Sequence, residues 1–72
     1  MMNTIKIGKC ERDICGRFYP IILNGKWVNE IQEYDMKHVN IKWKVLGNCY
    51  RYLSDAKRDA INYYRETETF GA

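Results

Sequence analysis

The sequence has little of what marks an exported, membrane-bound or disulfide-stapled protein. It contains one proline, three cysteines and no run near the roughly 18 apolar residues that a transmembrane helix requires. Its first residues, Met1 to Lys6, include no apolar segment of the kind found in signal peptides. An odd number of cysteines without such a signal favours reduced thiols over a disulfide framework. These absences predict a soluble protein of the cytoplasm.

Sequence motifs for catalysis are missing as well. The five glycines are isolated and form neither a Walker A sequence nor the spacing of a dinucleotide-binding fold. The carboxylates stand mostly beside basic residues or on the outer side of a predicted helix, where a solvated surface explains them. Asp35 and His38 with a cysteine lack the elbow and the oxyanion hole that a hydrolase nucleophile needs. We therefore expect no enzyme, no catalytic residue and no cofactor.

Four residues are of types that bind zinc in tetrahedral sites: Cys10, Cys15, His38 and Cys49. The spacing of the first two lies at the outer limit for zinc fingers, and the other two are distant in the chain. Buried or unreactive thiols explain these cysteines more simply. We predict that the chain folds without a metal ion.

The chain's 72 residues leave room for one domain with one core. A core of this size supplies only about 3–5 kcal/mol of net stability, so dense aromatic packing, a covalent staple or self-association is needed. Two tryptophans, six tyrosines and two phenylalanines provide the aromatic side chains. We expect a single domain over residues 1–72, whose tail at 67–72 frays because it has neither a cap nor a periodic pattern.

The clearest local signal is Asn24-Gly25, because both residues tolerate the positive φ of a type I′ hairpin turn. Apolar segments at 17–23 and 26–31 flank the turn and predict a β-hairpin. A two-residue loop predicts the pairs Leu23 with Lys26, Ile22 with Trp27, Ile21 with Val28, Tyr19 with Glu30, and Phe18 with Ile31. One face then carries Phe18, Ile22, Trp27 and Ile31, and the other carries Tyr19, Ile21, Leu23 and Val28.

Both faces of this hairpin are apolar, yet a single helix covers only one face of a sheet. The other face must therefore meet a loop, a second copy of the chain or a partner. Pro20 lacks a backbone donor, which predicts that its strand lies at a sheet edge or beside a bulge.

The remaining segments predict further short strands. Thr4 to Ile7 alternates and ends at Gly8, Cys10 to Cys15 forms a charged connection, and residues 33–38 form a crossing loop or one helical turn. Strict alternation over 39–45 predicts a strand with Val39, Ile41, Trp43 and Val45 inward. A turn at Gly47-Asn48 leads to a strand over 49–52. The expected pairs are Trp43 with Tyr52, Val45 with Tyr50, and Lys44 with Arg51.

Ser54 is a suitable N-cap and Asp55 suits the first turn, so a helix is predicted over about 54–66. Its apolar arc comprises Ala56, Ala60, Ile61, Tyr63 and Tyr64, and its polar side comprises Arg58, Asp59, Asn62, Arg65 and Glu66. The fold class is α+β, with a small antiparallel sheet of three to five short strands packed against this C-terminal helix. The expected core is Ile5, Ile41, Trp43, Val45, Tyr50, Tyr52, Ala56, Ala60 and Tyr64.

The predicted binding residues lie on the outward side of the second strand pair. Lys42, Lys44 and Arg51 should lie together there, and like charges placed opposite each other in a sheet favour an anion as compensation. Arg58 and Arg65 lie on one side of the helix and extend this basic surface. Trp27 and Phe18 are candidates for an apolar contact. The alternative is a solvated face whose lysines discourage edge-to-edge aggregation.

Two classes of function follow from these features. A basic sheet packed on one helix resembles the three-stranded DNA-binding domains of some tyrosine recombinases and the plant AP2 domains, from Val39 to Glu66, which implies a DNA- or RNA-binding domain. The other class, which we favour, is a protein ligand that inhibits or redirects a host protein or protein complex. The abundance of Ile, Lys, Asn and Tyr is typical of AT-rich genomes and small phage genes. A homodimer stays open as an alternative, and no membrane partner is expected.

Overall fold

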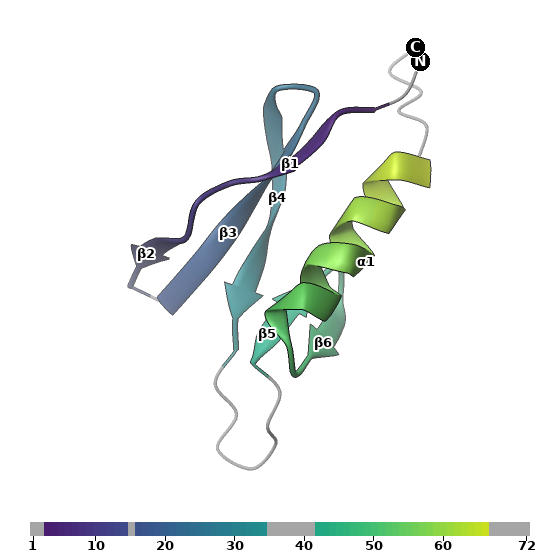
Figure 1. The fold of residues 1–72 in the computed structure, drawn as a ribbon. Helices are drawn as coiled ribbons and strands as arrows, with labels where there is room; N and C mark the ends of the chain where they lie inside the picture. The colour runs from purple at the N-terminus through teal and green to yellow at the C-terminus, as the bar shows by residue number, and fades with distance from the viewer. Residues whose placement is uncertain (1–2, 15, 35–41, 67–72) are drawn as a thin grey trace.

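The computed structural model describes residues 3–14, 16–34 and 42–66 (Figure 1). Its elements are β1 (Ile5–Ile7), β2 (Glu11–Asp13), β3 (Gly16–Leu23), β4 (Lys26–Glu33), β5 (Trp43–Val45), β6 (Asn48–Tyr50) and α1 (Leu53–Glu66). The predicted α+β class is confirmed, with an antiparallel sheet packed against one C-terminal helix. The sheet has six strands, because Glu11–Asp13 pairs with β3 instead of forming only a connection.

Strand β3 is the centre of the sheet, whose order is β1-β3-β4-β5-β6. β1 and β2 follow one another along the same side of β3, and β4 pairs along its other side. Helix α1 packs against β1, β5 and β6 from one face of the sheet (Figure 1). We call this the covered face and the opposite one the uncovered face.

The core lies between α1 and the covered face. Its buried members are Ile21, Ile31, Trp43, Val45, Ala56 and Ala60, and its partly buried neighbours are Ile5, Ile7, Tyr19, Leu46, Tyr50, Leu53 and Tyr64. Seven of the nine predicted core residues therefore belong to it. Tyr52 does not, since it is 60% exposed, and Ile41 lies outside the described residues. Ile21 and Ile31 were missed although both are fully buried.

The hairpin turn at Asn24 and Gly25 is confirmed, with φ values of 51° and 85°. The pairs Leu23–Lys26 and Ile22–Trp27 form as predicted. The other three predicted pairs are wrong, because the register shifts between Ile21 and Ile22 and leaves Val28 as an extra residue. The observed pairs are Ile21 with Asn29, Pro20 with Glu30, Tyr19 with Ile31, and Phe18 with Gln32.

This β-bulge changes the side to which half of β4 points. Side chains alternate strictly along a regular strand, so Trp27 and Ile31 would share one face. One extra residue reverses that alternation. Ile31 accordingly joins Ile21 in the core, while Trp27 stays on the uncovered face beside Phe18.

Pro20 lies in the central strand, so the predicted edge position is wrong, while the alternative of a neighbouring bulge is confirmed. The carbonyl of Pro20 accepts a 2.8 Å hydrogen bond from the amide of Gly8. The N–H and C=O of one strand residue point to the same side, so the missing donor of Pro20 faces the break between β1 and β2. Of the two bonds that such a pair exchanges in a regular ladder, the one donated by Gly8 is therefore the one that forms.

The second hairpin differs in register from the prediction. Leu46 and Gly47, with φ values of 54° and 76°, form its two-residue loop in place of Gly47-Asn48. The observed pairs are Trp43 with Tyr50, Lys44 with Cys49, and Val45 with Asn48. A shift by two residues preserves the faces, so Tyr50 still contacts the core. It removes Tyr52 and Arg51 from the strand.

Helix α1 begins at Leu53, one residue earlier than predicted. The carbonyl of Tyr52 accepts hydrogen bonds from the amides of Asp55 and Ala56, so Ser54 lies within the first turn and is not the N-cap. The buried stripe is narrower than the predicted arc, because Tyr63 is 49% exposed.

The segments predicted at 35–41 and 67–72 lie outside the described residues, and β4 already ends at Glu33. Within the described chain, α1 is neither long nor apolar enough to cross a membrane.

Candidate functional site

Apolar side chains lie along the hairpin on the uncovered face. Phe18, Ile22 and Trp27 share this face, as predicted, although Ile31 does not. The rings of Phe18 and Trp27 stack with centroids 5.9 Å apart and an interplanar angle of 23°. Phe18 is 9% exposed, whereas Trp27 keeps 54% of its surface exposed. The described part of the chain therefore leaves a large aromatic ring open to solvent on a fixed platform.

A hollow of about 440 Å³ lies on the other side of β3, where β1 gives way to β2. Its lining residues are Lys6, Ile7, Gly8, Lys9, Glu11, Pro20 and Ile22. Lys6 pairs with Ile22, and Glu11 pairs with Phe18, so both charged side chains point to the uncovered face. The apolar strip on β3 thus has charges and a depression on one side and Trp27 on the other.

The predicted basic residues lie at the opposite margin of this face. Lys44 pairs with Gln32, which pairs with Phe18. Lys42 is exposed just before β5, where it lines a small hollow with Tyr34, Arg17 and Glu33. The Lys44 ammonium lies 5.7 Å from the ring centroid of Tyr34, a cation–π contact.

The predicted pairing of Lys44 with Arg51 is wrong, since Lys44 lies opposite Cys49. The amide of Lys42 donates a 3.0 Å hydrogen bond to the carbonyl of Tyr50, the partner of Trp43, so Lys42 and Trp43 both lie opposite Tyr50. Arg51 is exposed and follows the end of β6. We call Lys42, Lys44, Arg51 and the adjoining Tyr34 the basic patch.

The helix arginines do not extend the basic patch, contrary to the prediction. Arg58 and Arg65 are exposed on α1, which packs on the opposite face of the sheet. Arg58 also has a carboxylate partner, because its guanidinium lies 3.8 Å from Asp55 one helical turn earlier. The sheet separates these two cations from Lys44.

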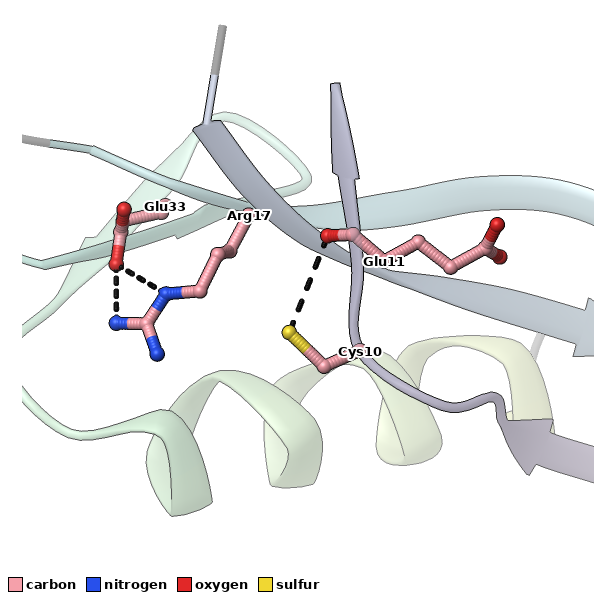
Figure 2. A network of polar contacts seen from close by, with 4 residues as sticks. All are labelled: Cys10, Glu11, Arg17 and Glu33. Atoms are coloured by element: carbon pink, nitrogen blue, oxygen red, sulfur yellow. Dashed lines mark hydrogen bonds and ion pairs between the residues drawn. The ribbon is translucent and has the colours of Figure 1, made fainter. Parts of the chain in front are cut away.

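A second polar cluster, missed from the sequence, lies at the end of the covered face. Arg17 Nε donates a 2.9 Å hydrogen bond to Glu33 Oε2, and the guanidinium lies 5.7 Å from the ring centroid of Trp43 (Figure 2). The hydrogen bond and the charge of Glu33 raise the pKa of Arg17 above its ordinary value. Side chains two residues apart on a strand share a face, so Arg17 lies on the same face as Tyr19 and Ile21. This alternation was the sequence signal from which the position of Arg17 could have been predicted. This cluster closes the open end of the core.

Tyr19 connects this cluster to α1. Its ring meets Trp43 edge to face at 5.6 Å, and the Lys57 ammonium lies 5.1 Å from its centroid. A hydrogen bond with Cys10, followed by burial, raises the pKa of the Tyr19 phenol. Figure 2 shows Cys10 on the same side as Arg17 and Glu33, with its thiol donating to the carbonyl of Glu11. These contacts stabilise the fold.

A similar polar contact joins β6 to the helix. Asn48 Nδ2 donates a 3.1 Å hydrogen bond to Asp59 Oδ2. A hydrogen bond with the same carboxylate, and then burial, raise the pKa of the Tyr50 phenol.

The candidate zinc ligands are only partly described. Cys10 and Cys49 are exposed free thiols, and Cys15 and His38 lie outside the described residues. Within residues 3–14, 16–34 and 42–66, no three histidine, cysteine or acidic side chains gather closely enough to hold a metal ion.

Comparison with known proteins adds no relative, since no protein-family model, curated protein or solved structure matches the chain. The resemblance to three-stranded DNA-binding domains finds no support in the fold, because β5 and β6 continue a sheet of six strands.

Proposed function

We propose that this chain is a non-catalytic binding protein that inhibits or redirects a host protein or protein complex, using the basic patch as its contact. The observation that carries this proposal is the set of exposed cations near Tyr34, where Lys44 contacts its ring and Lys42 lines the same small hollow. The ion pairs among the described residues are Arg17–Glu33 and Arg58–Asp55, and neither includes Lys42, Lys44 or Arg51.

Lys42 precedes β5 and Arg51 follows β6 at the same end of this hairpin, so the two cations approach each other, which costs free energy because like charges repel. An acidic surface on a partner relieves this repulsion and steers the encounter. Arginine and tyrosine are enriched in protein interfaces, and the patch supplies one exposed example of each. An acidic patch on a host protein is therefore the partner that this chemistry fits best.

The amino-acid composition suggests the kind of organism that encodes this chain. Frequent Ile, Lys, Asn and Tyr with a single Pro are typical of small phage genes. We propose a phage accessory protein that works in the host cytoplasm.

Nucleic acid is the second candidate, favoured by the contact between Lys44 and the ring of Tyr34. Cations that neutralise phosphates, combined with an aromatic ring that stacks on bases, are the usual elements of single-strand binding. The net charge of +3 provides only a weak general attraction.

Capture of partners from host lysate by tagged protein, with and without nuclease, tests both candidates. A protein band that persists after nuclease treatment supports the protein ligand. Lys42→Glu with Lys44→Glu should abolish this capture, because the acidic surface then meets carboxylates. The matched control is Arg58→Glu with Arg65→Glu, which reverses two exposed cations on the other side of the sheet and should leave capture unchanged.

Salt separates the two classes further. Phosphate contacts release counterions, so binding to single-stranded oligonucleotide would weaken steeply between about 50 and 200 mM salt. Undiminished capture by the Lys42→Glu and Lys44→Glu double variant would contradict both candidates.

A further inference from the structure

We propose that two copies of this chain associate through their uncovered faces, about a two-fold axis that runs along β3. The proposal goes beyond the basic patch and concerns the apolar strip, the hollow and Trp27. Each copy then acts as the second layer of the other, giving a β-sandwich with a helix on each outer side.

The uncovered face consists of three rows that cross β3. Paired residues place Lys6, Ile22 and Trp27 in the first row and Glu11, Phe18 and Gln32 in the third. The middle row holds Pro20 with Glu30 on one side and Gly8 on the other. A two-fold axis along β3 exchanges the two sides of each row. The β4 side of one copy therefore meets the β1–β2 side of its partner at the same height.

The shapes of the two sides match under this exchange. Trp27 starts from the β4 side in the first row, and its ring leans along the strip to stack on Phe18 of the third row, with 54% of its surface exposed. On the β1–β2 side the hollow of about 440 Å³ runs from Lys6 to Glu11, with Pro20 and Ile22 in its lining, and so covers the same heights. An enclosed cavity of about 150 Å³ holds a benzene ring. The open hollow of about 440 Å³ therefore has room for the larger indole ring. Each Trp27 thus enters the partner's hollow.

The charges match as well. Lys6 and Lys9 border the hollow, so they meet the indole face of Trp27 and the carboxylate of Glu30. In the third row, Glu11 meets the amide of Gln32, with Lys44 on the next strand beyond it. Figure 2 shows the Glu11 side chain pointing away from the Arg17–Glu33 pair, which leaves it available for this contact. No row brings two like charges together.

A second copy fits this face better than an unrelated partner for an energetic reason as well. The large side chains that are fully buried among the described residues are Ile21, Ile31 and Val45. A core this small gives marginal stability, and self-association is one of the ordinary remedies in chains of this size. The exposed ring of Trp27, supported by the buried Phe18, and the half-buried Ile22 supply the apolar centre that the second layer needs.

Sedimentation of the purified full chain against concentration tests the dimer, and a pair of charge reversals tests its geometry. Lys9→Glu alone places two carboxylates together at each of two symmetric contacts, and Glu30→Lys alone places two cations together. Each variant should raise the dimer dissociation constant by about tenfold or more. An equimolar mixture of the two variants restores both attractions, so it should form heterodimers that neither variant forms alone.

Two further variants complete the test. Trp27→Ala should raise the dissociation constant by about a hundredfold, because the loss of a central aromatic counts twice in a symmetric interface. Circular dichroism should show an unchanged fold. Lys26→Glu is the matched control, since Lys26 adjoins Trp27 but pairs with Leu23 and points to the covered face. It should leave the dissociation constant unchanged.

A wild-type chain that stays monomeric at the highest attainable concentration would overturn the proposal. A dimer that persists while the mixed variants fail to form heterodimers would overturn its geometry and place the contact elsewhere, for example at the β6 edge. Neither result affects the basic patch, because Lys9, Glu30 and Trp27 are not part of it.

Discussion

A Cβ atom added to Gly8 would lie 2.6 Å from Cγ of Pro20, while the Gly8 amide donates its hydrogen bond to the Pro20 carbonyl. The close approach joins the break between β1 and β2 to the central strand. We predict that Gly8→Ala lowers the free energy of unfolding by about 1–3 kcal/mol, because the rigid proline ring cannot turn aside. Urea unfolding measures this loss. Lys9→Ala, at the exposed neighbouring position, should change stability little, and equal losses in both variants would contradict the steric explanation.

The contact between α1 and the sheet depends on small side chains. Ala56 and Ala60 are fully buried. We predict that Ala60→Leu destabilises the fold by about 1–3 kcal/mol, since three added carbons cannot enter a packed interface without displacing the helix. Asn62→Leu, on the exposed side of the same helix, is the matched control and should cost little. The denaturant midpoints of the two variants decide the matter.

The first hairpin turn requires glycine at position 25 because of the backbone conformation there, and not because a side chain would collide with a neighbour. Gly25 has a φ of 85°, and no atom lies within 4 Å of a Cβ built on it. We predict that Gly25→Val costs more than about 1 kcal/mol, because a β-branched residue resists positive φ. Lys26→Val, one residue later in ordinary strand conformation, should cost less. A Gly25→Val variant as stable as the wild type in thermal melting would contradict the requirement.

The contact between Tyr50 and Asp59 predicts a loss of stability in alkaline solution. The hydrogen bond to Asp59, then burial, raise the pKa of Tyr50 above its ordinary value of 10.0. The folded state therefore favours the neutral phenol, and this contribution is fully present below pH 10.0 and is lost as the pH rises through the raised pKa. The pKa of Tyr19 is also raised, so its contribution to stability is likewise lost as the pH rises.

Tyr50→Phe isolates the share of Tyr50 in this decline. The melting temperature of the variant should be lower than that of the wild type at neutral pH, and the difference should shrink above pH 10. Tyr52→Phe, at a tyrosine that is 60% exposed, is the control and should leave the profile unchanged. A difference between Tyr50→Phe and wild type that grows with pH would show that the phenolate is favoured in the folded state.

The binding residues were only partly predictable. Lys44 was placed correctly because strand alternation is local, and that alternation put it on the uncovered face, whereas Lys42 lies just before β5, where alternation no longer applies. Arg51 was assigned to the wrong neighbour, since its position depends on which two residues form the turn. A leucine at positive φ is uncommon, so nothing local favoured Leu46-Gly47 over Gly47-Asn48. The Arg17–Glu33 pair joins strands whose register follows from the bulge.

The features that depend on near neighbours in the chain were predictable from the sequence alone. These are the turn at Asn24-Gly25, the alternation that buries Trp43 and Val45, and the helix with its stripe of Ala56 and Ala60. Each follows from backbone preferences or from a period that a short segment displays in full.

The tertiary structure alone decided where Ile31 and Trp27 point. Both are large apolar residues on one strand, and strict alternation puts them on one face. Packing against Ile21 and α1 stabilises Ile31 in the core, and a bulge at Val28 allows this while Trp27 remains on Phe18. The free energy that selects the bulge comes from contacts with segments distant in the chain. No local pattern in β4 contains that information.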